Sequence, residues 1–252
     1  MIRLLKQQCD RYPDKISIAR NYEEVQANEK AGRISAILTV EEGGIINGRA
    51  ERLEELWNMG VRLMTPMWNY RNCLGHPNSR NPEVMRKGLT AFGREIISRA
   101  GELGMIIDVS HASDQTFTDI LGCTDGPVIA SHSNCRALCE HPRNLTDDMI
   151  RSLAEAGGVA GLNLFPTFLN QENAVGLEYM AAHIMHMIRV GGSEFPAIGT
   201  DFDGYEVQNH EPIQKVSDMY KLWDALQKMG LSEDQLERIW RGNAERILKR
   251  MS

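Results

Sequence analysis

The chain has 252 residues, of which 42% are hydrophobic, so it is long enough to bury a sizeable core as one domain. Its net charge of -6 and the lack of a Lys- or Arg-dense segment argue against nucleic acid or anionic membranes as partners and favour a small-molecule substrate. No run approaches the roughly 18 apolar residues of a membrane span, and the first residues lack a signal-peptide pattern, so we expect a soluble, cytoplasmic protein unless a longer N-terminus carries a signal.

The order of the apolar runs predicts the fold class. Residues 1–30 have helical patterns, and from residue 34 to residue 200 short apolar runs alternate with amphipathic segments, which is typical of βα units around a parallel sheet. The predicted strands are residues 34–40, 61–67, 105–110, 127–131, 158–165 and 196–200. Thr146 is a predicted helix N-cap, and two C-terminal helices are predicted on either side of Gly230.

Two α/β architectures fit this order of elements incompletely. A closed parallel barrel has eight strands, so the predicted strands leave it two short. An open, doubly wound sheet usually carries a Gly-rich phosphate turn after its first strand, and "EEGGIINGRAE" has its glycines at the wrong spacing for that turn.

Polar side chains follow the ends of the predicted strands. They are Glu41 and Glu42, Trp68 and Asn69, His111, His132, Asn163, and Asp201 with Asp203. Reactive groups of a βα barrel lie at strand ends, and neutral imidazole with carboxylate is a ligand set for zinc or a similar divalent ion. A lone strand-end histidine is more often a core residue, and Glu42 or Asp201 alone could be a helix-entry or turn-capping carboxylate. Together they predict a metal site.

The remaining histidines and the cysteines carry weaker signals. His76, His141, His183, His186 and His210 lie in loops or helical segments, and the apolar setting of His183 and His186 indicates packing. Five cysteines without a regular framework indicate buried or free thiols rather than disulfides. Cys135 and Cys139 are four residues apart, as a metal pair on a helix would be, but no second cysteine pair completes a zinc-thiolate site.

The motifs "EEGG", "GLTAFGREIISRAGELGMIIDVSH", "VIASHSNCRALCEHPRNLTDD" and "IGTDFDG" occur in this order over nearly the whole chain. In them the sequence resembles the membrane dipeptidase (renal dipeptidase) family of the amidohydrolase superfamily. The resemblance implies a TIM-type (β/α)8 metal-dependent hydrolase that cleaves dipeptides at a two-zinc centre and often accepts a C-terminal D-residue. We therefore expect one barrel domain over residues 1–252 with C-terminal helices, lacking its first two strands in this chain.

The resemblance also implies roles for individual residues. Glu42 matches the glutamate that bridges both metals, and His111 and His132 match the histidines of the second metal. Asp201 matches the aspartate that manages the proton of the attacking water. Arg143 matches an arginine that holds the substrate carboxylate, a task for which a planar and permanently charged fork is suited.

Two departures from the family pattern bear on activity. The His-x-Asp pair that completes the first metal site in the family occurs nowhere in these 252 residues, and Trp68 stands at the substrate site where some members have a histidine. Glu42, His111 and His132 would still suffice for one zinc ion, so we expect one or two ions. The alternatives are a non-catalytic metal-binding homologue, and a hydrolase of the same fold that acts on another amide.

The two missing strands would leave open barrel edges. Either the chain is a shortened version of a longer protein, or a partner or second copy of the chain covers the edges.

Overall fold

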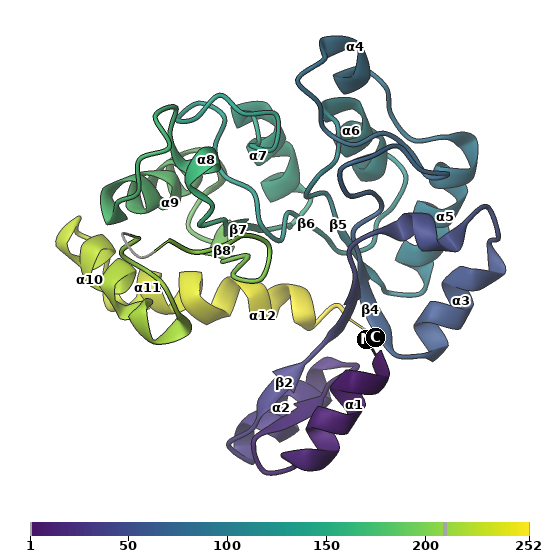
Figure 1. The fold of residues 1–252 in the computed structure, drawn as a ribbon, viewed down its shortest axis with the longest axis horizontal. Helices are drawn as coiled ribbons and strands as arrows, with labels where there is room; N and C mark the ends of the chain where they lie inside the picture. Colours follow the sequence, from purple (N-terminus) through teal and green to yellow (C-terminus); the bar gives the residue numbers. More distant parts are fainter. Residues whose placement is uncertain (1, 209–210, 252) are drawn as a thin grey trace.

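The structure, a computed structural model, describes residues 2–208 and 211–251. Parallel strands alternate with helices along the chain (Figure 1). The strands are β1 (Ile16–Ile18), β2 (Ile34–Ala36), β3 (Leu38–Val40), β4 (Val61–Met64), β5 (Ile106–Asp108), β6 (Val128–Ile129), β7 (Ala160–Leu162) and β8 (Pro196–Ile198). The α-helices are α1 (Ile2–Arg11), α2 (Tyr22–Lys30), α3 (Glu51–Asn58), α4 (Pro82–Met85), α5 (Ala91–Glu102), α6 (Asp114–Leu121), α7 (Asp147–Glu155), α8 (Pro166–Leu169), α9 (Leu177–Gly191), α10 (Tyr220–Lys228), α11 (Glu233–Glu237) and α12 (Asn243–Leu248). The short helical turns are η1 (Gly43–Ile46), η2 (Val216–Asp218) and η3 (Arg238–Gly242).

The strands from β3 to β8 follow one another in chain order. β3, β4, β5 and β6 form one parallel sheet, and β7 pairs in parallel with β8. A parallel bridge between Ala130 and Ala160 joins the two groups. The carboxyl ends of these strands therefore lie at one edge, which is where barrels of this type place their reactive groups.

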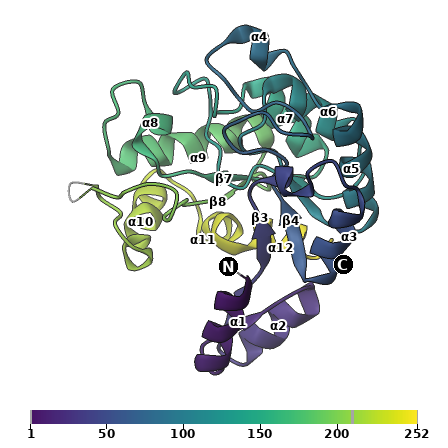
Figure 2. The same ribbon diagram turned by 45° about the vertical axis from the view of Figure 1, so that its right-hand side comes forward.

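Helices α3, α5, α6 and α7 cover one side of this sheet, and α9 lies against β7 and β8 (Figure 2). The N-termini of α5, α6 and α7 are capped as local chemistry predicts, because Thr90, Ser113 and Thr146 each accept a hydrogen bond from the backbone three residues on. The buried faces of α5, α6 and α7 belong to one continuous apolar core with the strands. The predicted N-cap at Thr146 is thus confirmed.

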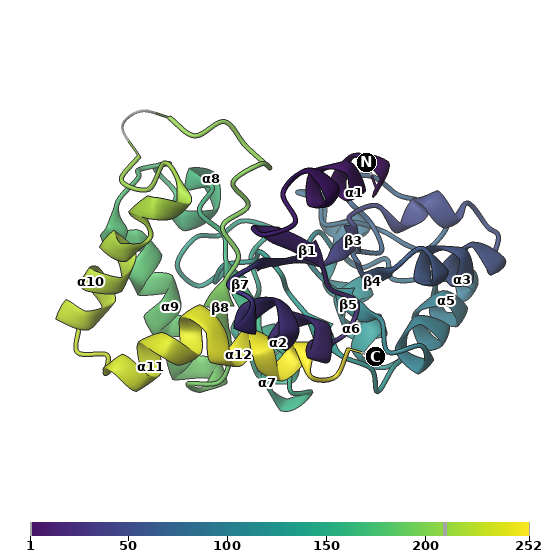
Figure 3. The ribbon, with the colours of Figure 1, turned by 90° about the horizontal axis from the view of Figure 1, so that it is seen from below.

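The segment from α1 to β2 projects from the rest of the molecule (Figure 1). Its helix α2 lies beside the C-terminal helices (Figure 3), where Arg241 pairs with Glu29 at 2.7 Å and the Lys249 amine lies over the Tyr22 ring. The C-terminal residues Ile247 and Met251 also pack with Ile106 of β5, Ala197 of β8 and Val159, which directly precedes β7. The C-terminal segment therefore connects this projecting segment to the sheet.

The six predicted strands are all present, but residues 1–30 also contain β1, which the sequence analysis missed. β1 pairs in parallel with β2, and the predicted strand over residues 34–40 is divided into β2 and β3 by one residue, so the count from the sequence is two strands too low for the described residues. Three half-buried residues between two helices are too short a run to show strand periodicity, and only the pairing with Ile34–Ala36 defines them. The two predicted C-terminal helices are confirmed as α10 and α11, with a capping box from Ser232 to Gln235.

No helix within residues 2–208 and 211–251 is both long enough and apolar enough to cross a membrane.

Candidate metal centre

Three side chains from three strand ends meet at one point. Glu41 directly follows β3, and His111 and His132 each lie three residues beyond β5 and β6. The Nε2 atoms of the histidines are 3.1 Å apart, and Glu41 Oε1 lies 3.2 Å from the first and 3.3 Å from the second. Because Asp108 and Ile129 are register partners in the parallel sheet, both histidines stand at the same level above it. Three potential ligand atoms therefore converge.

The electrostatics of this group favour the protonation states of metal ligands. Burial lowers the pKa of His111 to about 4, an effect that Glu41 opposes and the nearby Arg143 charge reinforces. Its close contacts with the His111 ring and then the His132 ring hold the pKa of Glu41 well below its usual range. At neutral pH the site therefore presents the neutral imidazole of His111 and the ionised carboxylate of Glu41, which are donors that suit a divalent cation.

The outward nitrogens of both histidines already have partners. Asn69 Oδ1 lies 2.9 Å from His111 Nδ1, and Ser131 Oγ lies 2.6 Å from His132 Nδ1. With Nδ1 engaged on each ring, Nε2 is the atom left for a ligand, and both Nε2 atoms face Glu41. The residues present therefore fit a bound cation. Asn69 was predicted at a strand end, whereas no role was predicted for Ser131, whose position directly before His132 was the available signal.

Glu42 is placed differently from the prediction. Its Oε1 accepts hydrogen bonds from Gly44 N at 2.8 Å and Asn72 Nδ2 at 2.6 Å, and its Oε2 accepts one from Trp68 N at 2.9 Å. The carboxylate that meets the two histidines belongs to Glu41 instead. Consecutive side chains of an extended segment point to opposite sides, so only one of two adjacent glutamates can face the histidines. Glu42 holds the loop after β4 against η1.

His111 and Asp201 have strained backbones. Their φ angles are 71° and 58°, in the left-handed region that residues other than glycine rarely adopt. Such strain persists only where the surrounding structure requires it, and it is common at functional sites. His111 and Asp201 therefore both have left-handed backbones at the carboxyl edge of the sheet.

Asp201 and Arg143 lie at the same edge but outside the three-residue group. Asp201 follows β8 and accepts a hydrogen bond at Oδ2 from Asn163 Nδ2 at 3.1 Å. Arg143 is only 7% exposed, and its guanidinium makes long hydrogen bonds of 3.4 Å to Ser133 Oγ and 3.3 Å to the His132 carbonyl. Burial lowers the pKa of Arg143 to about 10, against the attraction of Asp108, Asp201 and Glu41, so it stays charged at neutral pH.

An exposed aromatic pair borders the site. Trp68 and Tyr70 are 41% and 55% exposed, and their rings meet edge to face at 5.9 Å. The Trp68 ring is also 6.3 Å from the His111 ring. The side chain that the sequence predicted to contact substrate thus lies beside a candidate ligand.

Two of the other histidines, His183 and His186, are buried and have hydrogen-bond partners. His183 lies between Cys135 N at 3.1 Å and the Leu169 carbonyl at 2.9 Å, and His186 Nε2 lies 2.7 Å from Asp147 Oδ1. All five cysteines are free. His210 lies outside the described residues.

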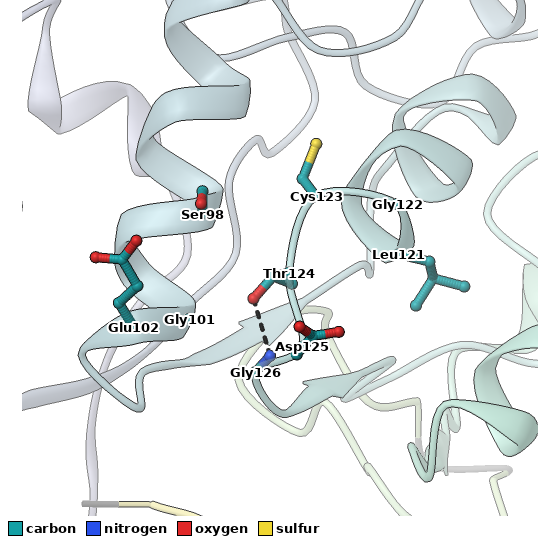
Figure 4. A pocket seen from close by; sticks show the side chains of 9 residues that line it. All are labelled: Ser98, Gly101, Glu102, Leu121, Gly122, Cys123, Thr124, Asp125 and Gly126. Atoms are coloured by element: carbon teal, nitrogen blue, oxygen red, sulfur yellow. Dashed lines mark hydrogen bonds between the residues drawn. The ribbon is translucent and has the colours of Figure 1, made fainter.

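One cavity of about 460 Å³ lies away from these residues (Figure 4). It is lined by the end of α5 and the turn before β6, and includes Glu102, Cys123 and Asp125. This turn precedes its strand, so the cavity lies at the amino edge of the sheet. Reactive groups of this architecture gather at the opposite edge.

Comparison with known proteins relates this geometry to a family. The family model described as membrane dipeptidase (peptidase family M19) matches residues 1–252. The chain is 32% identical to dipeptidase aclJ of Aspergillus oryzae, in a match that covers 98% of this chain and 59% of that protein. It is 29% identical to an uncharacterised Klebsiella pneumoniae protein encoded in the pqqA 5' region, in a match that covers 98% of this chain and 93% of that protein. A crystal structure of a Rhodobacter sphaeroides metallopeptidase, liganded with a phosphinate mimic of the dipeptide L-Ala-D-Ala, superimposes with a TM-score of 0.90 at 27% identity, over 99% of this chain and 72% of that one.

Proposed function

Because the chain belongs to the membrane dipeptidase family, peptidase family M19, we propose that it hydrolyses the peptide bond of dipeptides with a zinc ion held by Glu41, His111 and His132. The observation that carries this proposal is the convergence of two buried imidazole nitrogens and one carboxylate oxygen at separations of 3.1 to 3.3 Å. Three protein ligands with an open position are typical of catalytic zinc. When bound, such an ion supplies an activated water at neutral pH and polarises the peptide carbonyl.

We propose that Arg143 binds the C-terminal carboxylate of the dipeptide. Its guanidinium is buried, makes only two long hydrogen bonds, and has no carboxylate within ion-pair distance in the described part of the chain. A substrate carboxylate would supply the missing counter-charge and two charge-assisted hydrogen bonds. Because Arg143 also contacts the His132 carbonyl, this anchor lies next to the proposed ligands, which restricts the site to short substrates.

We propose that Asp201 moves the proton of the attacking water. Asn163 occupies Oδ2 of its carboxylate, which leaves Oδ1 to accept a proton and pass it to the leaving amine. The backbone of Asp201 is left-handed, a conformation that is common at functional sites. Trp68, with Tyr70, is proposed to pack against the substrate side chain, because aromatic surface beside a site favours apolar groups.

We also propose a stereochemical preference for the substrate and an assembly for the chain. The Rhodobacter sphaeroides relative was crystallised with a mimic of L-Ala-D-Ala, which supports a C-terminal D-residue as an acceptable substrate group here. β1 and β8 are the outermost of the described strands. We propose that a second copy of the chain, or another partner, covers their edges.

Hydrolysis of L,L and L,D dipeptides, measured with metal-depleted protein before and after addition of zinc, tests the function. We expect cleavage only after zinc is added, and a loss of more than about 100-fold in His111→Ala, because even outer-sphere partners of a metal cost 10- to 100-fold. Equal cleavage by wild type and His111→Ala would show that this centre is not the catalyst. Zinc binding without cleavage of any dipeptide would instead indicate a non-catalytic homologue.

A further inference from the structure

Asp108 is a buried carboxylate at the end of β5 that none of the roles above uses. It is 1% exposed, and its two oxygens accept four hydrogen bonds. Oδ1 accepts from the backbone nitrogens of Ser110 at 2.9 Å and Ser131 at 2.8 Å. Oδ2 accepts from the hydroxyls of Thr65 at 2.9 Å and Ser131 at 2.6 Å. A buried charge at a strand end is costly unless it is fully bonded, so this carboxylate has a specific task.

The hydrogen bonds of Asp108 lead to both candidate histidine ligands. Ser110 and Ser131, whose backbone nitrogens share Oδ1, directly precede His111 and His132 in the chain. The Ser131 hydroxyl lies 2.6 Å from His132 Nδ1, and the Ser110 hydroxyl accepts from His132 N at 3.1 Å. One carboxylate oxygen therefore joins the ends of β5 and β6 at the residues from which the two imidazoles project.

The direction of these hydrogen bonds determines the tautomer of His132. An ionised carboxylate only accepts, so the single hydroxyl hydrogen of Ser131 is donated to Asp108 Oδ2. The Ser131 oxygen must then accept from His132, which places the ring hydrogen on Nδ1. Nε2 is left with its lone pair, and it faces His111 Nε2 and Glu41 Oε1.

We propose that Asp108 is the positioning residue of the metal centre: through Ser131 it holds His132 in the Nδ1-protonated tautomer, and through the backbone of Ser110 and Ser131 it sets the spacing of the two histidines. This inference deepens the proposed function and rests on it for the identity of the ligands. Asp108 touches neither the substrate nor the ion, and acts through Ser131.

Nitrogen-15 NMR of the histidine rings in metal-free protein reads the tautomer directly. We expect Nδ1-protonated His132 in the wild type, a measurable Nε2-protonated population in Ser131→Ala, and the wild-type state again in Ser131→Thr, which keeps the hydroxyl. Thr65→Val is the matched control, because it removes another hydrogen bond to the same carboxylate without touching the link to His132. Zinc affinity, measured by competition with a chelator, should fall about 10- to 100-fold in Ser131→Ala and in Asp108→Asn.

An Nε2-protonated His132 in the metal-free wild type would overturn the inference, and this result needs no variant to fold. An unchanged tautomer in folded Ser131→Ala, or an equal shift in Thr65→Val, would overturn it as well. The tautomer is measured without metal or substrate. A wild type that binds no zinc but shows the Ser131-dependent tautomer would therefore refute the proposed function alone.

Discussion

The Nε2 atoms of His111 and His132 lie 3.1 Å apart although the residues are separated by 21 positions in the chain. The same separation relates the register partners Asp108 and Ile129 of β5 and β6. The parallel pairing of two short buried strands thus delivers two imidazoles to one point, and Glu41 from β3 approaches both.

Exchange of Glu41 and of Glu42 for glutamine separates a ligand from a structural neighbour. We expect Glu41→Gln to weaken zinc binding by more than about 100-fold, since a ligand should cost more than an outer-sphere partner. Glu42→Gln should retain zinc but lose about 1 to 3 kcal/mol of unfolding free energy, because three hydrogen bonds to its carboxylate are disturbed. Metal analysis and urea denaturation check both. If Glu42→Gln loses zinc and Glu41→Gln retains it, Glu42 is the ligand and Glu41 is not.

Arg143→Lys should reduce kcat/KM for dipeptides by about 10- to 100-fold, mainly through KM, because lysine cannot provide a two-pronged contact to a carboxylate. The matched substrate is a dipeptide amide, which lacks the C-terminal charge. Wild type should cleave the amide poorly, and Arg143→Lys should lower that rate little further. An equal loss on both substrates would contradict the assigned contact.

Asp201→Asn should lower kcat by about 100- to 10,000-fold with little change in zinc content, because it removes a proton acceptor. Asparagine tolerates the left-handed backbone found at this position, where φ is 58°, so the loop should keep its shape. Steady-state kinetics and metal analysis check the result. A variant with undiminished kcat would exclude Asp201 as the proton carrier.

Acid should destabilise the fold through His183. Burial lowers the pKa of His183 to about 4, so the unfolded chain, with a pKa near 6.5, binds the proton more tightly. Stability is therefore complete above pH 6.5 and falls as the pH drops toward 4, by about 3 kcal/mol at most for this group. Urea denaturation of wild type and His183→Gln between these pH values tests this. If the unfolding free energies of the two proteins fall equally as the pH drops, this prediction is wrong.

Thr146→Ala should cost about 1 kcal/mol of unfolding free energy, because Thr146 accepts the hydrogen bond that caps α7. Thr146→Ser keeps the acceptor and should restore most of the loss. Thermal denaturation of the three proteins gives the comparison.

The alternation of apolar runs was enough to predict the parallel α/β fold and the strand ends that carry polar groups. Each run from residue 34 onward became a strand, since buried parallel strands are almost continuously apolar. The three residues of β1 escaped this reasoning because they are half-buried, and their pairing with β2 joins segments 18 residues apart. The family resemblance and its shared motifs were likewise readable without coordinates.

The sequence alone identified His111, His132 and Glu42 as ligand candidates, because residue type and position after a strand are local properties. Only the tertiary structure shows that Glu41, and not Glu42, faces the two histidines, since adjacent side chains point to opposite sides of an extended segment. The hydrogen bonds that link Asp108 through Ser131 to His132 could not be predicted from the sequence either. They depend on distances of a few ångströms between two strands, which the packing of the whole sheet determines.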